Sequence, residues 1–219
     1  MSDLEQSLRE ELVAESNRLI ETGLNKGTSG NLSVRSGDRM LITPSAVMVP
    51  DLTPDKMASM PIDGNYGSWE GPLRPSTEWQ FHLDIMRTRD EVGAIVHTHA
   101  PNCTILAMCR KMIPAAHYMV SVFGGLNVRC SGWALPGSKE LSDEALRALE
   151  GRNACLLANH GMITLGDSLA KAMWRAEELE NYAYEYVQTL MIGGPVILSD
   201  DEMAEHMENA KNYGVQSKD

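Results

Sequence analysis

Apolar residues recur along the chain with two periods, and the longer period predicts helices. In residues 4–20 leucines stand among charges at the three- and four-residue spacings of a one-sided helix, and Gly23 follows as its stop. Similar spacing predicts a helix after Ser76 and Thr77, which would cap it, and another that opens at Pro101. Further helices are expected over residues 141–149, 168–191 and 200–211.

The shorter period, in which alternate residues are apolar, predicts strands, as do short apolar runs rich in β-branched residues. These patterns occur at residues 32–35, 40–43, 94–99 and 154–157. Residues 50–76 hold five prolines and three glycines, which predicts turns and short strands. Strands and helices mix without strict βαβ alternation. We therefore expect one domain over residues 1–219, a three-layer α/β sandwich around a mixed sheet.

The charge balance narrows the classes of partner. The chain has 219 residues, with 19 Lys and Arg against 30 Asp and Glu and a formal net charge of −11. That balance disfavours a surface that binds nucleic acid by neutralising phosphates. No apolar stretch approaches the ~20 residues of a membrane span, the amino terminus lacks a signal-peptide run, and the cysteines form no Cys-x-x-Cys pair. We expect a cytoplasmic protein with reduced thiols, no nucleic acid or membrane partner, and small, locally held phosphates.

Two histidines on one predicted strand are the sharpest chemical signal. His97 and His99 stand two residues apart, so their side chains point to the same face of the sheet. Two imidazoles so placed can converge on one divalent metal, although a polar pair on a wetted sheet face has the same spacing. His160, in Asn-His-Gly directly after another apolar strand, offers a third imidazole. A three-histidine site leaves a coordination position open for substrate, as catalytic metal sites do.

One carboxylate stands where it could act beside such a metal. Glu78 lies at the start of a predicted helix, where it stabilises the helix dipole whether or not it is catalytic. If that helix end faces the metal, Glu78 becomes an acid/base candidate. The remaining histidines give weaker signals: His82 is expected to cap or hydrogen-bond, His117 to be satisfied among apolar residues, and His206 to lie on a solvated helix.

A glycine-containing segment has the composition of an anion-binding loop. Residues 27–31, GTSGN, combine flexible backbone N–H groups with hydroxyl and amide donors. They match neither the Walker A motif nor GxGxxG, and a plain loop has the same composition. Residues 43–45 and 76–77 supply further hydroxyls. Local, uncharged contacts of this kind allow a net-negative protein to hold a phosphate.

Together these segments resemble the class II, metal-dependent aldolase and epimerase family, most of all its L-fuculose-1-phosphate aldolase branch. The matching stretches run in order over nearly the whole chain: GTSGNLSVR (27–35), LITPS (41–45), RPSTEWQFH (74–82), VHTHA (96–100), IPAAHYM (113–119), LANHG (157–161) and YG (213–214). Each stretch alone is a weak signal, and the ordered set is highly specific.

The resemblance implies an α/β/α fold with a mostly antiparallel sheet, in a homotetramer with active sites at subunit interfaces. It implies one zinc ion per subunit, bound by His97, His99 and His160, with Glu78 as the acid/base. Tyr118 would reach into a neighbouring subunit's site as a proton donor or acceptor, and a mobile Tyr213 would help to close the site. The residues implied to hold the substrate phosphate are Thr28, Gly30, Asn31, Thr43, Ser45, Ser76 and Thr77.

The implied reaction is the reversible cleavage of a ketose 1-phosphate, such as L-fuculose 1-phosphate, into dihydroxyacetone phosphate and a short aldehyde. Zinc would stabilise the enediolate without a Schiff-base lysine. Tyr118, or a water that it positions, would take the C4 hydroxyl proton, and Glu78 would protonate the enediolate carbon. Two departures from the branch concern the pocket: Ala46 replaces a common glycine, and WALPG (133–137) replaces Tyr-Ala-Thr-Phe-Gly. The second leaves lactaldehyde, a deoxy-aldehyde and a methylthio-aldehyde open.

Three other functions stay as alternatives. An L-ribulose-5-phosphate 4-epimerase would carry aspartate in place of Glu78, and a phospho-keto-acid decarboxylase tends to have lysine in place of Thr77. An adducin-like head domain, which acts as an interaction module, lacks the histidine set that this chain keeps. These differences favour the lyase.

Overall fold

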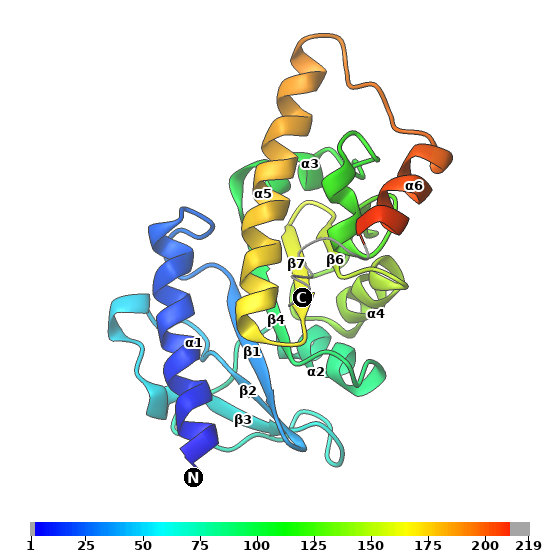
Figure 1. Cartoon of the computed structure of the whole chain (residues 1–219). Coiled ribbons are helices and arrows are strands. Elements are labelled where there is room, and N and C mark those ends of the chain that lie inside the picture. The colour runs from blue at the N-terminus through cyan, green and yellow to red at the C-terminus, as the bar shows by residue number, and fades with distance from the viewer. Residues whose placement is uncertain (1–2, 211–219) are drawn as a thin grey trace, which may run out of the picture.

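A seven-stranded sheet runs through the centre of the structure, a computed structural model that describes residues 3–210 (Figure 1). Its strands are β1 (Asn31–Ser36), β2 (Arg39–Ile42), β3 (Ala58–Pro61), β4 (Ala94–Thr98), β5 (Arg129–Cys130), β6 (Ala154–Leu157) and β7 (Gly161–Gly166). Their spatial order is β3-β2-β1-β4-β7-β6-β5, and every neighbouring pair is antiparallel except β5 and β6. The expectation of a mixed, mostly antiparallel sheet is confirmed.

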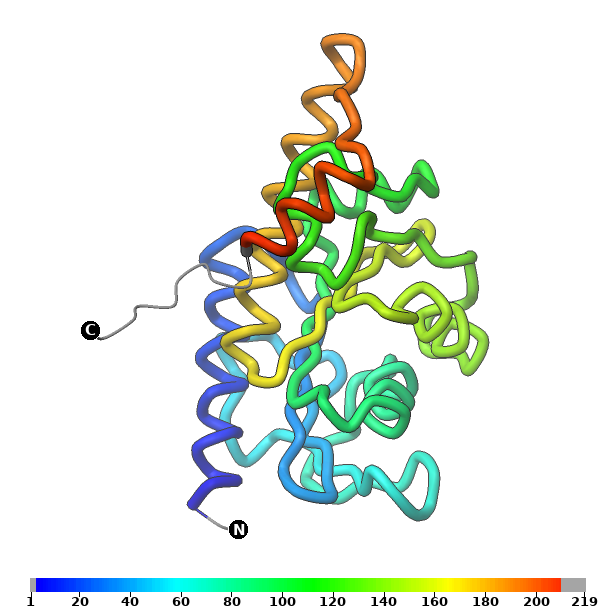
Figure 2. The backbone as a smooth tube through the Cα atoms, turned by 45° about the vertical axis from the view of Figure 1, so that its right-hand side comes forward, coloured from blue at the N-terminus to red at the C-terminus, as the bar shows by residue number. Residues whose placement is uncertain are grey.

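Helices cover both faces of this sheet, which makes the predicted three layers. One face carries α1 (Asp3–Glu21), α3 (Pro101–Met108) and α5 (Leu169–Met191), and the other carries α2 (Trp79–Thr88) and α4 (Lys139–Leu149). Figure 1 shows α1 and α5 side by side in front of the strands, and in Figure 2 α2 and α4 lie on the opposite side of the strands from these two helices. The shorter elements are η1 (Val49–Asp51), η2 (Pro54–Lys56), η3 (Tyr118–Phe123) and α6 (Asp200–Ala210), the last of which packs on η3.

Alternating side chains of the strands divide the interior into two cores. Leu32 and Val96 face the layer of α1, α3 and α5, whereas Ile95 and Ile163 face the layer of α2 and α4. All four side chains are completely buried and have no contact with solvent. This two-sided burial explains why β4 and β6 have continuous apolar runs in the sequence rather than alternating apolar and polar residues. Among residues 3–210, no helix is long and apolar enough to cross a membrane.

Two strands and one helix start differ from the sequence expectations, whereas β3 is a short strand within residues 50–76, as expected there. β5 is only two residues long, and β7 begins and ends with glycine, so neither has a strong strand pattern. α2 is not capped by Ser76 or Thr77, because Glu78 occupies the N-cap position. The Ser76 hydroxyl instead accepts a hydrogen bond from the Glu78 backbone N–H, at 3.3 Å.

Candidate active site

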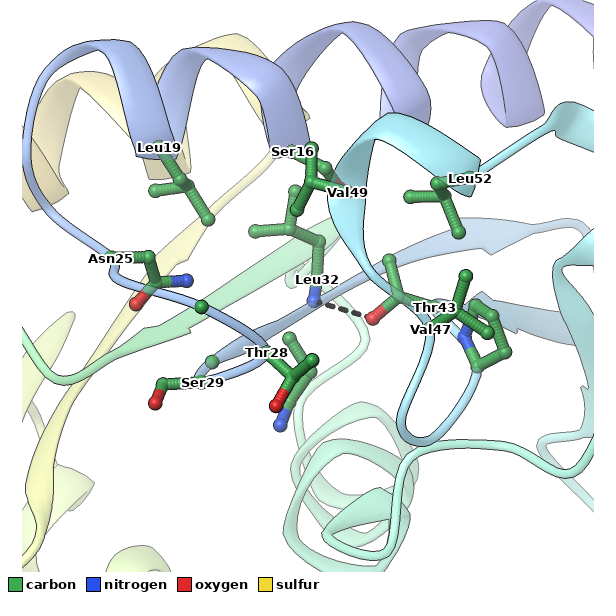
Figure 3. A pocket seen from close by; sticks show the side chains of 14 residues that line it. Ser16, Leu19, Asn25, Thr28, Ser29, Leu32, Thr43, Val47, Val49 and Leu52 are labelled. Carbon is green, nitrogen blue, oxygen red and sulfur yellow. Dashed lines mark hydrogen bonds between the residues drawn. The ribbon is translucent and has the colours of Figure 1, made fainter.

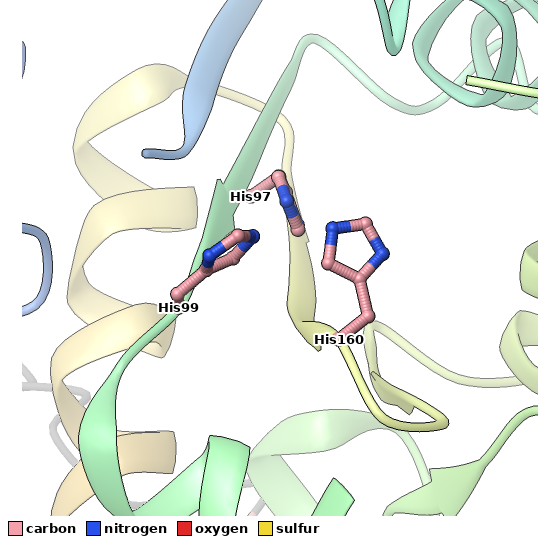
Figure 4. Close-up of side chains that lie close together, drawn as sticks. All are labelled: His97, His99 and His160. Atoms are coloured by element: carbon pink, nitrogen blue, oxygen red, sulfur yellow. The ribbon is translucent and has the colours of Figure 1, made fainter. Parts of the chain in front are cut away.

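Three histidine rings converge where β4 ends and the β6–β7 turn folds back over it (Figure 4). β4 pairs with β7 in the register His97↔Ile163, which brings His160 in the turn beside β4. The ring centroids of His97, His99 and His160 lie 4.8 to 5.1 Å apart, and one nitrogen from each ring lies within 4.8 Å of the others. The sequence-predicted trio is therefore brought together.

Hydrogen bonding leaves polar atoms unpaired inside the cluster. His97 Nδ1 donates to the carbonyl oxygen of Met162 at 2.9 Å, which directs Nε2 to the interior. Four buried atoms have no hydrogen-bond partner among the described residues: His97 Nε2, His99 Nε2, His160 Nδ1 and Glu78 Oε1. An unpaired buried polar atom costs about 1–3 kcal/mol. A cation shared by the rings would remove much of that cost, so the donor set fits the divalent metal on which this class of site depends.

Glu78 lies against two of the three rings. Its Oε2 is 3.1 Å from His97 Nε2 and its Oε1 is 3.1 Å from His160 Nε2, and the residue is 8% exposed. Burial raises the pKa of the Glu78 carboxyl, but attraction to His97 and His160 lowers it more, to well below the usual range. Burial, with His97 and His160 nearby, lowers the pKa of His99 to about 4, so that ring is neutral at pH 7 and able to bind metal. The carboxylate is thus ionised and directed at the metal position.

A cavity of about 280 Å³ opens beside Glu78. Its lining is Thr28, Ser29, Gly30, Asn31, Pro44, Ser45, Ala46, Ser76, Thr77, Glu78, His99, Pro136 and His160. Six of the seven residues expected to hold phosphate are in this set, and Thr43 is the exception. Ser29 belongs to the expected anion-binding loop, and Ala46 and Pro136 lie in the two segments where the sequence departs from the branch. Among the described residues, no lysine or arginine lines the cavity. An anion there would meet hydroxyl, amide and backbone N–H donors.

Backbone pairing between two loops brings the hydroxyl groups together. Pro44 and Pro75 form an isolated antiparallel bridge, with Ser45 N–H donating to the Arg74 carbonyl at 3.1 Å and Ser76 N–H to the Thr43 carbonyl at 3.0 Å. Ala46, which lines the cavity, has a left-handed φ of +58°. Glycine adopts this conformation without strain, which agrees with the glycine that the resemblance implies at this position.

Gly30 brings the loop of residues 27–30 into close contact with β4, the strand that carries His97. It has φ of +75°, and a Cβ added there would lie 2.2 Å from Asn25 Nδ2 and 2.7 Å from the His97 carbonyl oxygen. Asn25 Oδ1 in turn accepts from His99 N–H at 3.3 Å. The loop and the metal-facing strand are therefore fixed to each other. Asn25 was missed from the sequence because an asparagine before a glycine-rich loop carries no chemical signal of its own.

Thr43 lies behind the loop of residues 27–30 and does not line the cavity beside Glu78. Its Oγ1 accepts from Leu32 N–H at 3.2 Å, beside a second small cavity of about 40 Å³ between α1 and the loop (Figure 3). Ser16 and Leu19 of α1 face this second cavity. In the structure Thr43 supports the loop backbone, and contact with phosphate stays a prediction.

Tyr118 does not line the cavity of its own chain among the described residues. Tyr118 begins η3 and is 47% exposed, with its ring centroid 4.3 Å from that of His117 and 4.8 Å from that of His206. Tyr213 lies outside residues 3–210. The expected contact of Tyr118 with a neighbouring subunit stays a prediction. His117 is exposed rather than buried among apolar residues, because the segment leaves the core at this point.

Comparison with known proteins places this fold and site in a family. Residues 10–187 match the family described as Class II Aldolase and Adducin N-terminal domain. The chain is 48% identical over 208 residues to a 5-methylthioribulose-1-phosphate/5-deoxyribulose-1-phosphate aldolase of Rhodospirillum rubrum, covering 95% of this chain and 93% of that one. It is 43% identical over 199 residues to the L-fuculose phosphate aldolase of Escherichia coli K12, covering 90% and 91%.

A solved structure agrees with these sequence relatives. An L-fuculose 1-phosphate aldolase superimposes with a TM-score of 0.89 at 40% identity, covering 96% of this chain and 98% of that one. The fold and site define a class II, metal-dependent aldolase domain. The chain belongs to the Class II Aldolase and Adducin N-terminal domain family, and the expectation of an aldolase-class enzyme is confirmed.

The first prediction concerns the loop contact. We expect Gly30→Ala to lower the free energy of unfolding by about 1–3 kcal/mol more than Gly27→Ala, because its new Cβ collides with packed atoms. Gly27 is a matched control, since its φ is also positive, at +66°, and a Cβ there meets nothing within 4 Å. Denaturant unfolding measures both. Equal losses in the two variants would contradict the packing argument.

The second prediction concerns the metal. His97→Ala, His99→Ala and His160→Ala should each bind much less metal than the unchanged chain, because each removes one of three imidazole ligands. His117→Ala, which removes an imidazole outside the cluster, should keep full metal content. Elemental analysis of each purified variant gives the metal per subunit. Unchanged metal in the three cluster variants would refute the site.

Proposed function

We propose that the protein is a zinc-dependent aldolase that reversibly cleaves a ketose 1-phosphate into dihydroxyacetone phosphate and a short aldehyde. The observation that carries this proposal is the position of Glu78, a buried carboxylate 3.1 Å from His97 and from His160 that also lines the cavity. At this position the Glu78 carboxylate faces both the three histidines and the cavity in which a substrate would bind. His97, His99 and His160 would hold one zinc ion per subunit.

The chain's own residues would perform distinct parts of the reaction. A bound zinc ion supplies positive charge that stabilises the anion left when a carbon–carbon bond breaks. Glu78, ionised at rest, removes a proton from C3 of the three-carbon fragment in the synthetic direction and returns it to C3 in the cleavage direction, where the proton lost by the C4 hydroxyl keeps the balance. Tyr118 of a neighbouring subunit, or a water that it positions, takes the C4 hydroxyl proton. Thr28, Ser45 and the other hydroxyl and amide groups of the cavity bind the phosphate without net positive charge.

For the aldehyde half, we favour a 5-deoxy- or 5-methylthio-pentulose 1-phosphate. Pro136 lines the cavity, and its neighbours Leu135 and Trp133 are 65% and 57% exposed. Apolar groups at a cavity mouth favour a substrate that ends in a methyl or methylthio group. The name of the Rhodospirillum rubrum relative supports this choice. L-Fuculose 1-phosphate, whose aldehyde also ends in a methyl group, is the second candidate and is supported by the other relatives.

We further propose that the enzyme is a cytoplasmic homotetramer with active sites at subunit interfaces. Tyr118 is half exposed and does not line the cavity of its own chain, as a residue that serves a neighbouring subunit requires. Met108 and Met112 are also exposed, at 62% and 51%, which a subunit contact would cover.

The third prediction tests the acid/base. Glu78→Gln should keep the fold and the metal but lower kcat by about 10²–10⁴-fold, because the amide cannot carry the proton. Glu91→Gln, on the surface, is the control and should leave kcat unchanged. Coupled kinetics, melting curves and metal content are measured on both variants. A fully active Glu78→Gln enzyme would end the assignment.

The fourth prediction tests the reaction and the substrate. The enzyme should release dihydroxyacetone phosphate from 5-methylthioribulose 1-phosphate and 5-deoxyribulose 1-phosphate, with higher kcat/KM than from L-fuculose 1-phosphate. A chelator should abolish this release, and added zinc should restore it, because the charge on the cleaved fragment then has its counter-charge again. A coupled assay for dihydroxyacetone phosphate measures each case. An epimerised pentose without that product would instead indicate the epimerase.

A further inference from the structure

His82 lies beneath Glu78 and is completely buried, although the reaction proposed above does not use it. It lies on α2 and its ring stacks on Phe81 with 4.5 Å between centroids. Each ring nitrogen has one side-chain partner: Nδ1 lies 2.7 Å from Ser33 Oγ, and Nε2 lies 2.5 Å from Asn31 Oδ1. Asn31 Nδ2 then donates to Glu78 Oε2 at 3.0 Å. A continuous chain of hydrogen bonds thus runs from Ser33 to the carboxylate.

The direction of every bond in this chain follows from its last member. A carboxylate only accepts hydrogen bonds, so the amide nitrogen of Asn31 must face Glu78 and the amide oxygen must face His82. His82 Nε2 therefore carries the proton. Burial lowers the pKa of His82 to about 3, so the ring is neutral and its Nδ1 has a lone pair, to which the Ser33 hydroxyl donates.

We propose that His82 is a positioning residue, held by Ser33 as the Nε2–H tautomer, which locks the Asn31 amide so that its NH₂ group supports Glu78. The proposal rests on the acid/base role of Glu78. In the opposite tautomer the ring would present a lone pair to Asn31, and the amide would have to turn over to pair with it. Its carbonyl oxygen would then face the Glu78 carboxylate, two acceptors in contact, and would push the carboxylate from its place.

Local structure supports a dedicated role for this chain of bonds. Asn31 and Ser33 stand two residues apart on β1, so both point to the face that α2 covers, and Asn31 is paired directly with His97. Ser33 and His82 are both completely buried between apolar side chains. Burial of polar groups is costly without full pairing, and here each donor meets an acceptor. The result is a rigid link from the sheet interior to one oxygen of Glu78.

The fifth prediction tests this link by kinetics. Ser33→Ala removes the hydroxyl that fixes the tautomer, and we expect kcat to fall about tenfold to hundredfold, with KM changed less than about twofold and metal content retained. Ser142→Ala is the matched control, because Ser142 is also completely buried and its hydroxyl donates to a side chain, Asp84, away from the cavity. It should lose similar stability and keep its kcat. Unchanged kcat in Ser33→Ala would overturn the proposal.

A second pair of variants separates positioning from packing. His82→Gln retains an N–H that can reach Asn31, whereas His82→Leu fills the space without a donor, so the first should keep clearly more activity at equal metal content. Nitrogen NMR of the zinc-loaded wild-type enzyme should show the proton on His82 Nε2, and the Ser33→Ala enzyme should show a shift toward the other tautomer. A proton on His82 Nδ1 in the wild type would overturn the positioning role of His82, even if the Glu78→Gln variant confirms Glu78 as the acid/base. A proton on Nε2 in an enzyme without aldolase activity would instead overturn only the proposed function.

Discussion

The antiparallel pairing of β4 with β7 is the contact on which the candidate site depends. It places the turn that carries His160 against the end of the strand that carries His97, so residues far apart in the sequence meet around one point. Glu78 enters from a different layer, at the N-cap of α2. Four buried atoms of these side chains have no hydrogen-bond partner among residues 3–210. The fold thus retains buried polar atoms whose cost a bound cation would offset, and a site of this kind gives up stability for function.

The side of the cavity proposed to bind phosphate follows a different physical rule. A chain with a net charge of −11 would repel an anion over long distances, and no described lysine or arginine lines the cavity to oppose that field. The donors available instead are hydroxyl groups and loop N–H groups, which act at short range. The bridge between Pro44 and Pro75 and the close contact of Gly30 with β4 hold these loops in position. Such donors act over a few ångströms, so selectivity depends on the rigidity of the loops.

Sequence reasoning was most successful where one residue type allows few roles. A His-x-His pair on a strand and a third histidine after another strand predicted the converging rings, and the ordered motifs predicted the family. It did not find β7, whose run begins and ends with glycine, or the contribution of Asn25, whose side chain acts only through its neighbours. His82 was expected only to cap or hydrogen-bond. Which partners it has, and in which direction, depends on the sheet register, and register is a tertiary property that no local pattern records.

The site therefore combines elements with different tolerance to change. His97 on β4 and the Ser33–His82–Asn31 chain lie in the interior, on strands and a helix, where a substitution leaves a buried atom unpaired. His99 follows the end of β4 and His160 lies in the β6–β7 turn, and both are half-buried. Ala46 and the segment around Pro136 lie on loops at the edge of the cavity, where side chains can change without disturbing the sheet. Under the proposed function, the chemistry depends on the interior and the choice of substrate on the loops. Relatives that share the interior but act on different aldehydes are what this division of the structure leads one to expect.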